Sequence, residues 1–176
     1  MRGVPRYKVV LEEHSADWAQ EFAQVREGLK RIHGDNAVDI QHVGSTAIEG
    51  IAAKPMLDIA IRFRRMNDAV MAAMAGNGYA YYGEVARGKH LFILRGEQGE
   101  SLQHVHCYGE EGDGLFREQL RFRDFLRAHR EYALAYEQLK RELCRRYADD
   151  RSSYTAGKQQ FFDMIGRLAR EEADER

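Results

Sequence analysis

The sequence has few cysteines, no long apolar run and no excess of charge of either sign. Its two cysteines, Cys107 and Cys144, lie far apart in a chain of 176 residues. That spacing excludes a zinc knuckle or a CxxC redox site and is typical of a reducing compartment. No apolar stretch approaches the roughly 20 residues that cross a bilayer, and the start of the chain does not read as a secretory signal. We therefore expect a soluble, cytoplasmic protein without a membrane partner.

The charges balance almost exactly in number, with 27 basic and 28 acidic side chains. A protein that coats nucleic acid non-specifically needs an excess of Lys and Arg, so that function is excluded. Only six of the basic residues are lysine, which leaves 21 arginines. The planar guanidinium suits phosphate and carboxylate groups, but a general preference for arginine codons explains the same ratio.

Hydrophobic periodicity predicts alternating strands and helices in the first two thirds of the chain. We expect strands over residues 7–11, 37–43, 56–63, 79–85, 91–95 and 102–108. Residues 56–63 should form a central strand. An amphipathic helix should follow Ser15 and end at Gly34, and Asn67 should cap a second helix.

From Leu115 onward the pattern is helical, with expected helices through residues 132–147 and 154–168. The chain therefore predicts an α+β fold, in which helices flank a mixed β-sheet. We place the boundary after residue 112. Residues 1–112 form the sheet-containing core, and residues 113–176 form a C-terminal helical segment packed on it.

Polar residues gather where two of the expected strands meet their loops. Gly44, Ser45 and Thr46 follow the strand over 37–43, and a glycine-containing turn of this kind exposes backbone N–H and hydroxyl groups that bind phosphate. Asp58 lies on a strand whose other face is apolar. A carboxylate there needs a partner, which is either a ligand group or Arg62 at the end of the same strand.

The segment QHVGSTAIEGIAAKPMLDIAI, residues 41–61, resembles the signature of the GrpB family, a group placed in the nucleotidyltransferase superfamily. The stretch FREQLRFRDFLRAHREYALAYEQLKRELCRRY and the pair Tyr154 and Lys158 are also similar to that family. The resemblance covers residues 7–168 and implies a nucleotidyltransferase-like sheet. It further implies a Gly-Ser turn that binds a nucleoside triphosphate, and three carboxylates that hold two Mg²⁺ ions for phosphoryl transfer.

The resemblance transfers to this chain only in part. Gly44 and Ser45 match the turn, and Asp58 matches the first carboxylate. Ala60 occupies the position of the second carboxylate, and the strand expected to supply the third, residues 102–106, contains no acidic residue. Because Mg²⁺ prefers oxygen ligands, two-metal transfer is not expected to be efficient.

The strand that is expected to supply the third carboxylate contains two histidines instead. His104 and His106 lie two apart on a predicted strand, so they share a face and can approach Asp58, as can His42. A set of His42, Asp58, His104 and His106 suits a transition metal such as Zn²⁺, Fe²⁺ or Ni²⁺ better than Mg²⁺. Ordinary polar contacts on a half-exposed sheet explain the pair equally well.

The sequence thus predicts one cleft in which the Gly44–Thr46 turn, Asp58, His104 and His106 meet, with the last three as candidate catalytic residues. The candidate ligand-binding residues are Gly44, Ser45, Thr46, Lys54, Lys89, Arg121 and Lys158. We expect a nucleotide or a phosphorylated small molecule as the ligand. Two alternatives stay open: a metal-dependent enzyme of another class that uses the His and Asp residues, and a non-catalytic binding module.

Overall fold

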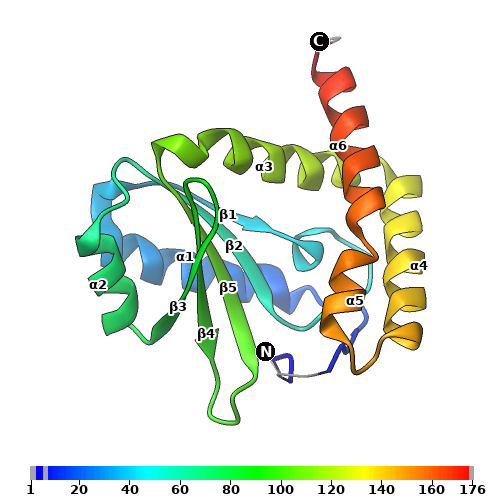
Figure 1. Ribbon diagram of the computed structural model, residues 1–176, viewed down its shortest axis with the longest axis horizontal. Coiled ribbons are helices and arrows are strands. Elements are labelled where there is room, and N and C mark those ends of the chain that lie inside the picture. The colour runs from blue at the N-terminus through cyan, green and yellow to red at the C-terminus, as the bar shows by residue number, and fades with distance from the viewer. Residues whose placement is uncertain (1–2, 6–7, 175–176) are drawn as a thin grey trace.

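The computed structural model describes residues 3–5 and 8–174 and contains one five-stranded mixed sheet with helices around it (Figure 1). The strands are β1 (Ala37–Val43), β2 (Leu57–Phe63), β3 (Tyr79–Ala86), β4 (Lys89–Arg95) and β5 (Ser101–Tyr108). The helices are α1 (Asp17–His33), α2 (Asp68–Gly76), α3 (Asp113–Ala128), α4 (Arg130–Arg146), α5 (Arg151–Ala156) and α6 (Gln159–Asp174). Within the described ranges, no helix is both long and apolar enough to span a membrane.

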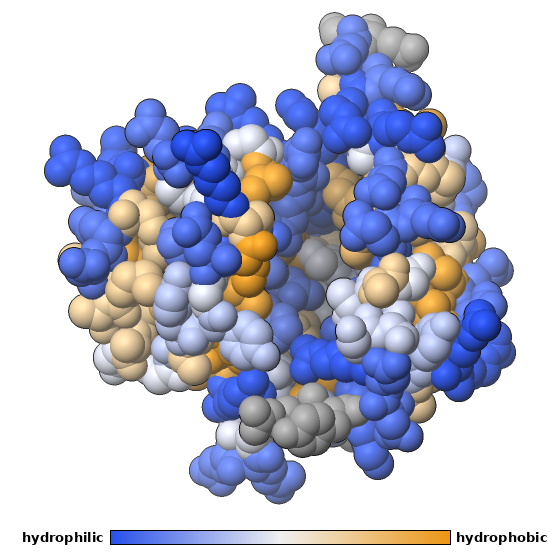
Figure 2. Space-filling model, viewed as in Figure 1, coloured by the Kyte–Doolittle hydropathy of each residue, from blue (hydrophilic) through white to orange (hydrophobic). Residues whose placement is uncertain are grey.

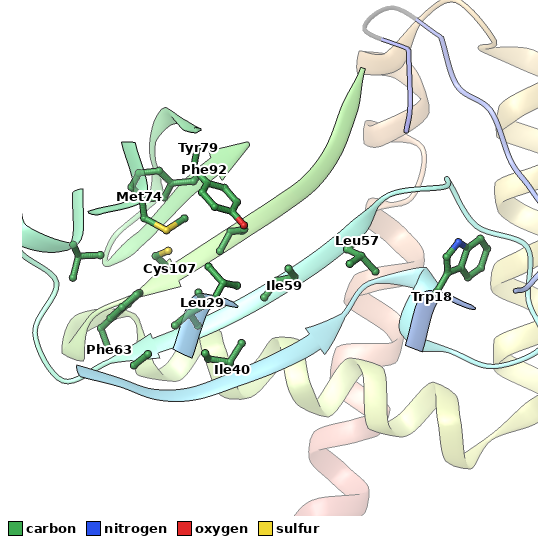
Figure 3. Packing of buried hydrophobic residues seen from close by; sticks show 14 of the residues in the cluster. Trp18, Leu29, Ile40, Leu57, Ile59, Phe63, Met74, Tyr79, Phe92 and Cys107 are labelled. Atoms are coloured by element: carbon green, nitrogen blue, oxygen red, sulfur yellow. The ribbon is translucent and has the colours of Figure 1, made fainter. Parts of the chain in front are cut away.

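The strand order is β1-β2-β5-β4-β3, which confirms the predicted mixed sheet. β2 runs parallel to β5, and all other neighbouring strands are antiparallel. β2 is flanked on both sides, although the middle position belongs to β5. Alternation places Leu57, Ile59 and Ile61 on one face, where they pack with residues of α1 and α2 such as Leu29 and Met74 (Figure 3). Ile59 and Ile61 are completely buried.

The other face of the sheet carries the polar residues and is covered by α3. Phe116 of α3 packs against Val43, Ala60 and Tyr108 on this face. Helices α3, α4 and α6 share a second apolar cluster with residues of the loop that precedes β2. The helix predicted over residues 154–168 is divided into α5 and α6 at Gly157 and Lys158. Figure 1 shows α4, α5 and α6 beside the sheet, where they are separated from its face by α3 or by loops.

The predicted strand over residues 7–11 is wrong in its described part, residues 8–11, which form no strand. Val9 donates its backbone N–H to the carbonyl of Ala148, at 2.9 Å. Its hydrogen bond therefore goes to a residue just after α4 and not to the edge of the sheet. Its side chain is buried with Leu143 and Tyr154. The apolar character that predicted a strand reflects packing against the C-terminal helices.

Asn67 caps α2, because its side-chain oxygen accepts the N–H of Val70 at 3.2 Å. Replacing Asn67 with alanine leaves that N–H without its acceptor, so the free energy of unfolding should fall by about 1 kcal/mol. Asn67→Ser is the matched control, since serine caps as well as asparagine and should stay within a few tenths of a kcal/mol. Urea denaturation measures both, and an equal loss in the two variants would show that the cap contributes nothing.

Candidate functional site

A cleft of about 420 Å³ lies between the polar ends of β2 and β5 on one side and the C-terminal helices on the other. Figure 2 shows the furrow between these parts, with hydrophilic residues within it and a strip of hydrophobic residues along its left edge. Nine predicted site residues line the cleft: Gly44, Ser45, Thr46, Lys54, Asp58, Lys89, His104, His106 and Lys158. The structure therefore brings together the turn, the carboxylate and the histidine pair.

The parallel pairing of β2 with β5 places Asp58 directly beside His104. The Asp58 Oδ1 atom lies 3.7 Å from His104 Nδ1 and 4.0 Å from His106 Nε2. The second ring nitrogen of each histidine is buried and has no hydrogen-bond partner within the described residues. Each imidazole thus faces the same carboxylate through one nitrogen. Arg62, the alternative partner for Asp58, instead pairs with Asp113 at 3.6 Å.

Burial keeps both imidazoles neutral near pH 7. It lowers the pKa of His104 to about 4 and that of His106 to about 3, although the Asp58 charge acts in the opposite direction. Lys89 lowers the pKa of His106 further. Neutral imidazoles do not compensate the negative charge of Asp58, so its counter-charges must come from elsewhere in the cleft.

Four of the six lysines of the chain supply positive charge in this one cleft: Lys54, Lys89, Lys140 and Lys158. Arg151 adds a fifth cationic side chain. Burial lowers the pKa of every one of these lysines, to about 7 for Lys140 and about 8 for Lys158. One carboxylate faces five basic groups, and such an imbalance in a partly enclosed space favours an anionic ligand.

Sequence reasoning missed Lys140 and Arg151. Lys140 follows Tyr136 by four residues on α4, its ammonium lies 4.7 Å from the Tyr136 ring centre, and it donates a hydrogen bond to the carbonyl of Ala52. A signal for Lys140 existed, because lysine is rare in this chain and this one lies within an otherwise apolar helical stripe. Arg151 had no comparable signal among 21 arginines.

His42 is not part of the cluster around Asp58, which corrects the predicted metal set. β1 pairs with β2 so that Val43 lies opposite Asp58 and His42 lies opposite Ile59, on the apolar face. The His42 ring stacks on Phe22 with centres 4.8 Å apart, and its Nε2 atom lies 2.9 Å from Thr46 Oγ1. His42 therefore contacts the turn at Thr46 from the apolar side of the sheet.

Arg121 is likewise wrong as a residue of the cleft. It lines a separate depression between α3 and α6, together with Asp124 and Ala169. That depression shares no lining residue with the cleft. Arg121 points to this second site because α3 crosses the sheet with Phe116 and Arg123 directed inward, and Arg121 falls on the outer side of the helix.

The residues present do not fit a two-magnesium centre. Ala60, at the position of the second carboxylate, is completely buried among Val43, Tyr108 and Phe116, so that position is part of the apolar packing. Among the described residues, no group of three or more His, Cys, Asp or Glu side chains is placed to hold a metal ion. Asp58 is the only carboxylate that lines the cleft within this part of the chain.

Sequence and structure comparisons define the class of protein to which this fold and cleft belong. The profile of the GrpB protein family matches residues 8–167. The glutamate-rich protein GrpB of Alkalihalophilus pseudofirmus is 34% identical over 171 residues, which cover 94% of this chain and 98% of that protein. The UPF0157 protein YqkA of Bacillus subtilis is 34% identical over 160 residues, or 89% of this chain, which spans only about half of YqkA (46%).

The fold agrees with a solved member of the same family. The crystal structure of the conserved protein GrpB from Enterococcus faecalis superimposes with a TM-score of 0.86 at 26% identity, over 93% of this chain and 99% of that one. A partial similarity, with a TM-score of 0.44 at 12% identity, extends to Cid1 in complex with its product ApU and covers 39% of that chain. The protein described here belongs to the GrpB family.

Proposed function

We propose that the protein binds a phosphorylated small molecule or a nucleotide in the cleft, and that it does not catalyse two-metal phosphoryl transfer. The observation that carries this proposal is the gathering of four lysines and Arg151 around the Gly44–Thr46 turn. Lysine ammonium groups bind phosphate as point charges, and partial burial strengthens the attraction because less water screens it.

The turn offers complementary hydrogen-bond donors. Gly44 has a φ of +69°, and Ser45–Ala47 form a single 3-10 turn directly after β1. Ser45 lines the cleft together with Tyr136 of α4, so its hydroxyl lies at the cleft wall. Backbone N–H groups of such turns and a nearby hydroxyl complement phosphate oxygens. Asp58 would then orient the lysines by electrostatic attraction, or accept a hydrogen bond from a hydroxyl group of the ligand.

The ligand experiment compares two variants that lose the same charge at different places. Pyrophosphate, a nucleoside monophosphate and a nucleoside triphosphate are titrated into the protein by calorimetry. Lys89→Gln should weaken binding about 10-fold or more, because a charge-assisted hydrogen bond contributes about 1.5–3 kcal/mol. Arg121→Gln, in the separate depression, should leave the dissociation constant within about twofold. Equal weakening by both would show that only overall charge matters, and no binding to wild type would refute the proposal.

Binding should also take up protons at pH 8. Lys140, whose pKa is lowered to about 7 by burial, is largely neutral there in the free protein. A bound anion raises lysine pKa values, because an opposite charge nearby favours the charged form. Calorimetry at pH 8 in buffers of different ionisation enthalpy should therefore report net proton uptake, whereas release or no change would place the phosphate away from these lysines.

Incubation of the protein with a nucleoside triphosphate and Mg²⁺ tests the second part of the proposal, that the protein does not catalyse two-metal phosphoryl transfer. With Ala60 buried in place of a carboxylate, Mg²⁺ should not create transfer activity with common triphosphates. Product analysis after prolonged incubation measures this, and robust Mg²⁺-dependent transfer would contradict it.

A transition-metal enzyme is the second candidate. The two imidazole nitrogens within 4.0 Å of one Asp58 oxygen favour it, although the described residues form no complete group of metal ligands as they stand. Elemental analysis of the purified protein tests it. A stoichiometric metal that is lost in His106→Gln would favour this candidate over the anion-binding cleft, because imidazole is a common transition-metal ligand.

A further inference from the structure

The cations of the cleft are mostly lysines in a chain that otherwise uses arginine. The protein has 21 arginines and six lysines, yet the cleft holds four lysines and one arginine. Arginine binds phosphate in a bidentate manner and keeps its charge at all accessible pH values. Lysine, in contrast, can lose its proton and then act as a nucleophile towards a carbonyl carbon. The composition of the cleft therefore suggests amine chemistry in addition to charge.

Lys158 has the placement of such a nucleophile. It lies at the break between α5 and α6, with its Nζ atom 4.9 Å from the ring centre of Tyr154 and 5.5 Å from that of Phe162. Within the described residues, Nζ forms no hydrogen bond or ion pair, and the residue is only partly exposed. Two aromatic rings thus hold the amine at the cleft, and neither ring uses the nitrogen in a hydrogen bond.

Lys140 is placed differently. It is only 2% exposed, and its Nζ atom donates to the carbonyl of Ala52. Its amine is therefore engaged by a backbone carbonyl and shielded from the ligand, whereas Lys158 is partly exposed.

The electrostatic surroundings agree with this assignment. Burial lowers the pKa of Lys158 to about 8, and the nearby charges of Lys54 and Arg151 act in the same direction, against Asp58. A substantial fraction of the amine is therefore neutral at slightly alkaline pH. Desolvation next to another cationic group is a known way of activating a lysine nucleophile.

We propose that Lys158 forms an imine with the carbonyl carbon of a phosphorylated aldehyde or ketone, whose phosphate is bound by the other basic groups of the cleft. This inference rests on the proposed function and narrows its ligand to one chemical class. The neutral amine attacks the carbonyl carbon to form the C–N bond, and a proton moves from nitrogen to oxygen to give a carbinolamine. The hydroxyl then leaves as water after protonation, and nitrogen loses its remaining proton. The step is a condensation that needs no oxidant, reductant or metal.

The test uses pyridoxal 5′-phosphate, an aldehyde that carries a phosphate, at equimolar concentration. The imine is reduced with borohydride, and peptide mass spectrometry locates the modified lysine. Lys158 should be labelled at least 10-fold more than Lys8 and Lys30, which lie outside the cleft. Pyridoxal, which lacks the phosphate, should label Lys158 at least 10-fold less, and pyrophosphate should compete with the phosphorylated probe.

Lys158→Arg is the decisive variant, because it keeps the positive charge but cannot form an imine. It should lose the cleft adduct, whereas the exposed control Lys8→Arg should keep it in full. Thermal melting of both variants shows that they are folded. Even labelling of all lysines, or a cleft adduct that persists in Lys158→Arg, would overturn the proposal.

Failure of this inference is distinguishable from failure of the proposed function. If the wild-type protein binds pyrophosphate in calorimetry but gives no adduct at Lys158, the imine is wrong and the anion site stands. If pyrophosphate does not bind and both aldehydes label Lys158 equally, the phosphate site and this proposal are both overturned.

Discussion

Lowering the pH from 7.5 to 5.5 is expected to reduce the free energy of unfolding by about 4 kcal/mol, because three buried histidines resist protonation. Burial lowers the pKa of His42 to about 4, that of His104 to about 4 and that of His106 to about 3. In the unfolded chain each titrates near 6.5. Below pH 6.5 the unfolded state therefore binds protons that the folded state does not, and stability falls as the pH falls.

Urea denaturation at pH 7.5, 6.5 and 5.5 measures this loss. His104→Gln should flatten the dependence by about a third, since it removes one of three groups that each contribute about 1.4 kcal/mol over the whole interval from pH 7.5 to 5.5. The matched control is His90→Gln, because His90 lies outside the cleft, where it contacts the hydroxyl of Tyr81. A stability that is constant between pH 7.5 and 5.5 would show that these imidazoles are charged in the folded protein.

Periodicity was sufficient to predict the strands that build the cleft. The alternation of Leu57, Ile59 and Ile61 fixed the buried face of β2, and with it the side on which Asp58 lies. The same alternation placed His104 and His106 together on one face of β5. Grouping them with Asp58 further required that β2 and β5 be neighbours, which is a property of the sheet topology and not of either segment.

The errors follow from register and from helix packing. A shift of one residue between β1 and β2 would turn His42 to the cleft face, and nothing in the sequence of either strand determines that register. Lys140 and Arg151 enter the cleft because α4 and α5 stand beside the sheet, far from Asp58 along the chain. The break at Gly157 was hidden by helical periodicity on both sides of it.

Replacing Gly44 with alanine is expected to destabilise the protein by about 3 kcal/mol and to abolish ligand binding in the cleft. Gly44 has a φ of +69° and a ψ of −171°, a conformation that is essentially restricted to glycine. An added Cβ would also lie 2.7 Å from the Cβ of Asp58, so the carboxylate or the turn must move. Glycine is needed here because β1 and the turn pass closely over the side chain of Asp58 itself.

Gly28→Ala is the matched control, since Gly28 lies within α1 and an added Cβ there meets no atom within 4 Å. Alanine has the higher helix propensity, so this variant should gain about 0.5–1 kcal/mol. Chemical denaturation gives both stabilities, and pyrophosphate titration of the folded fraction gives the binding. A Gly44→Ala protein that keeps wild-type stability would mean that the turn relaxes freely. In that case Asp58 and Ser45 would not be held in the fixed arrangement from which an anion site is inferred.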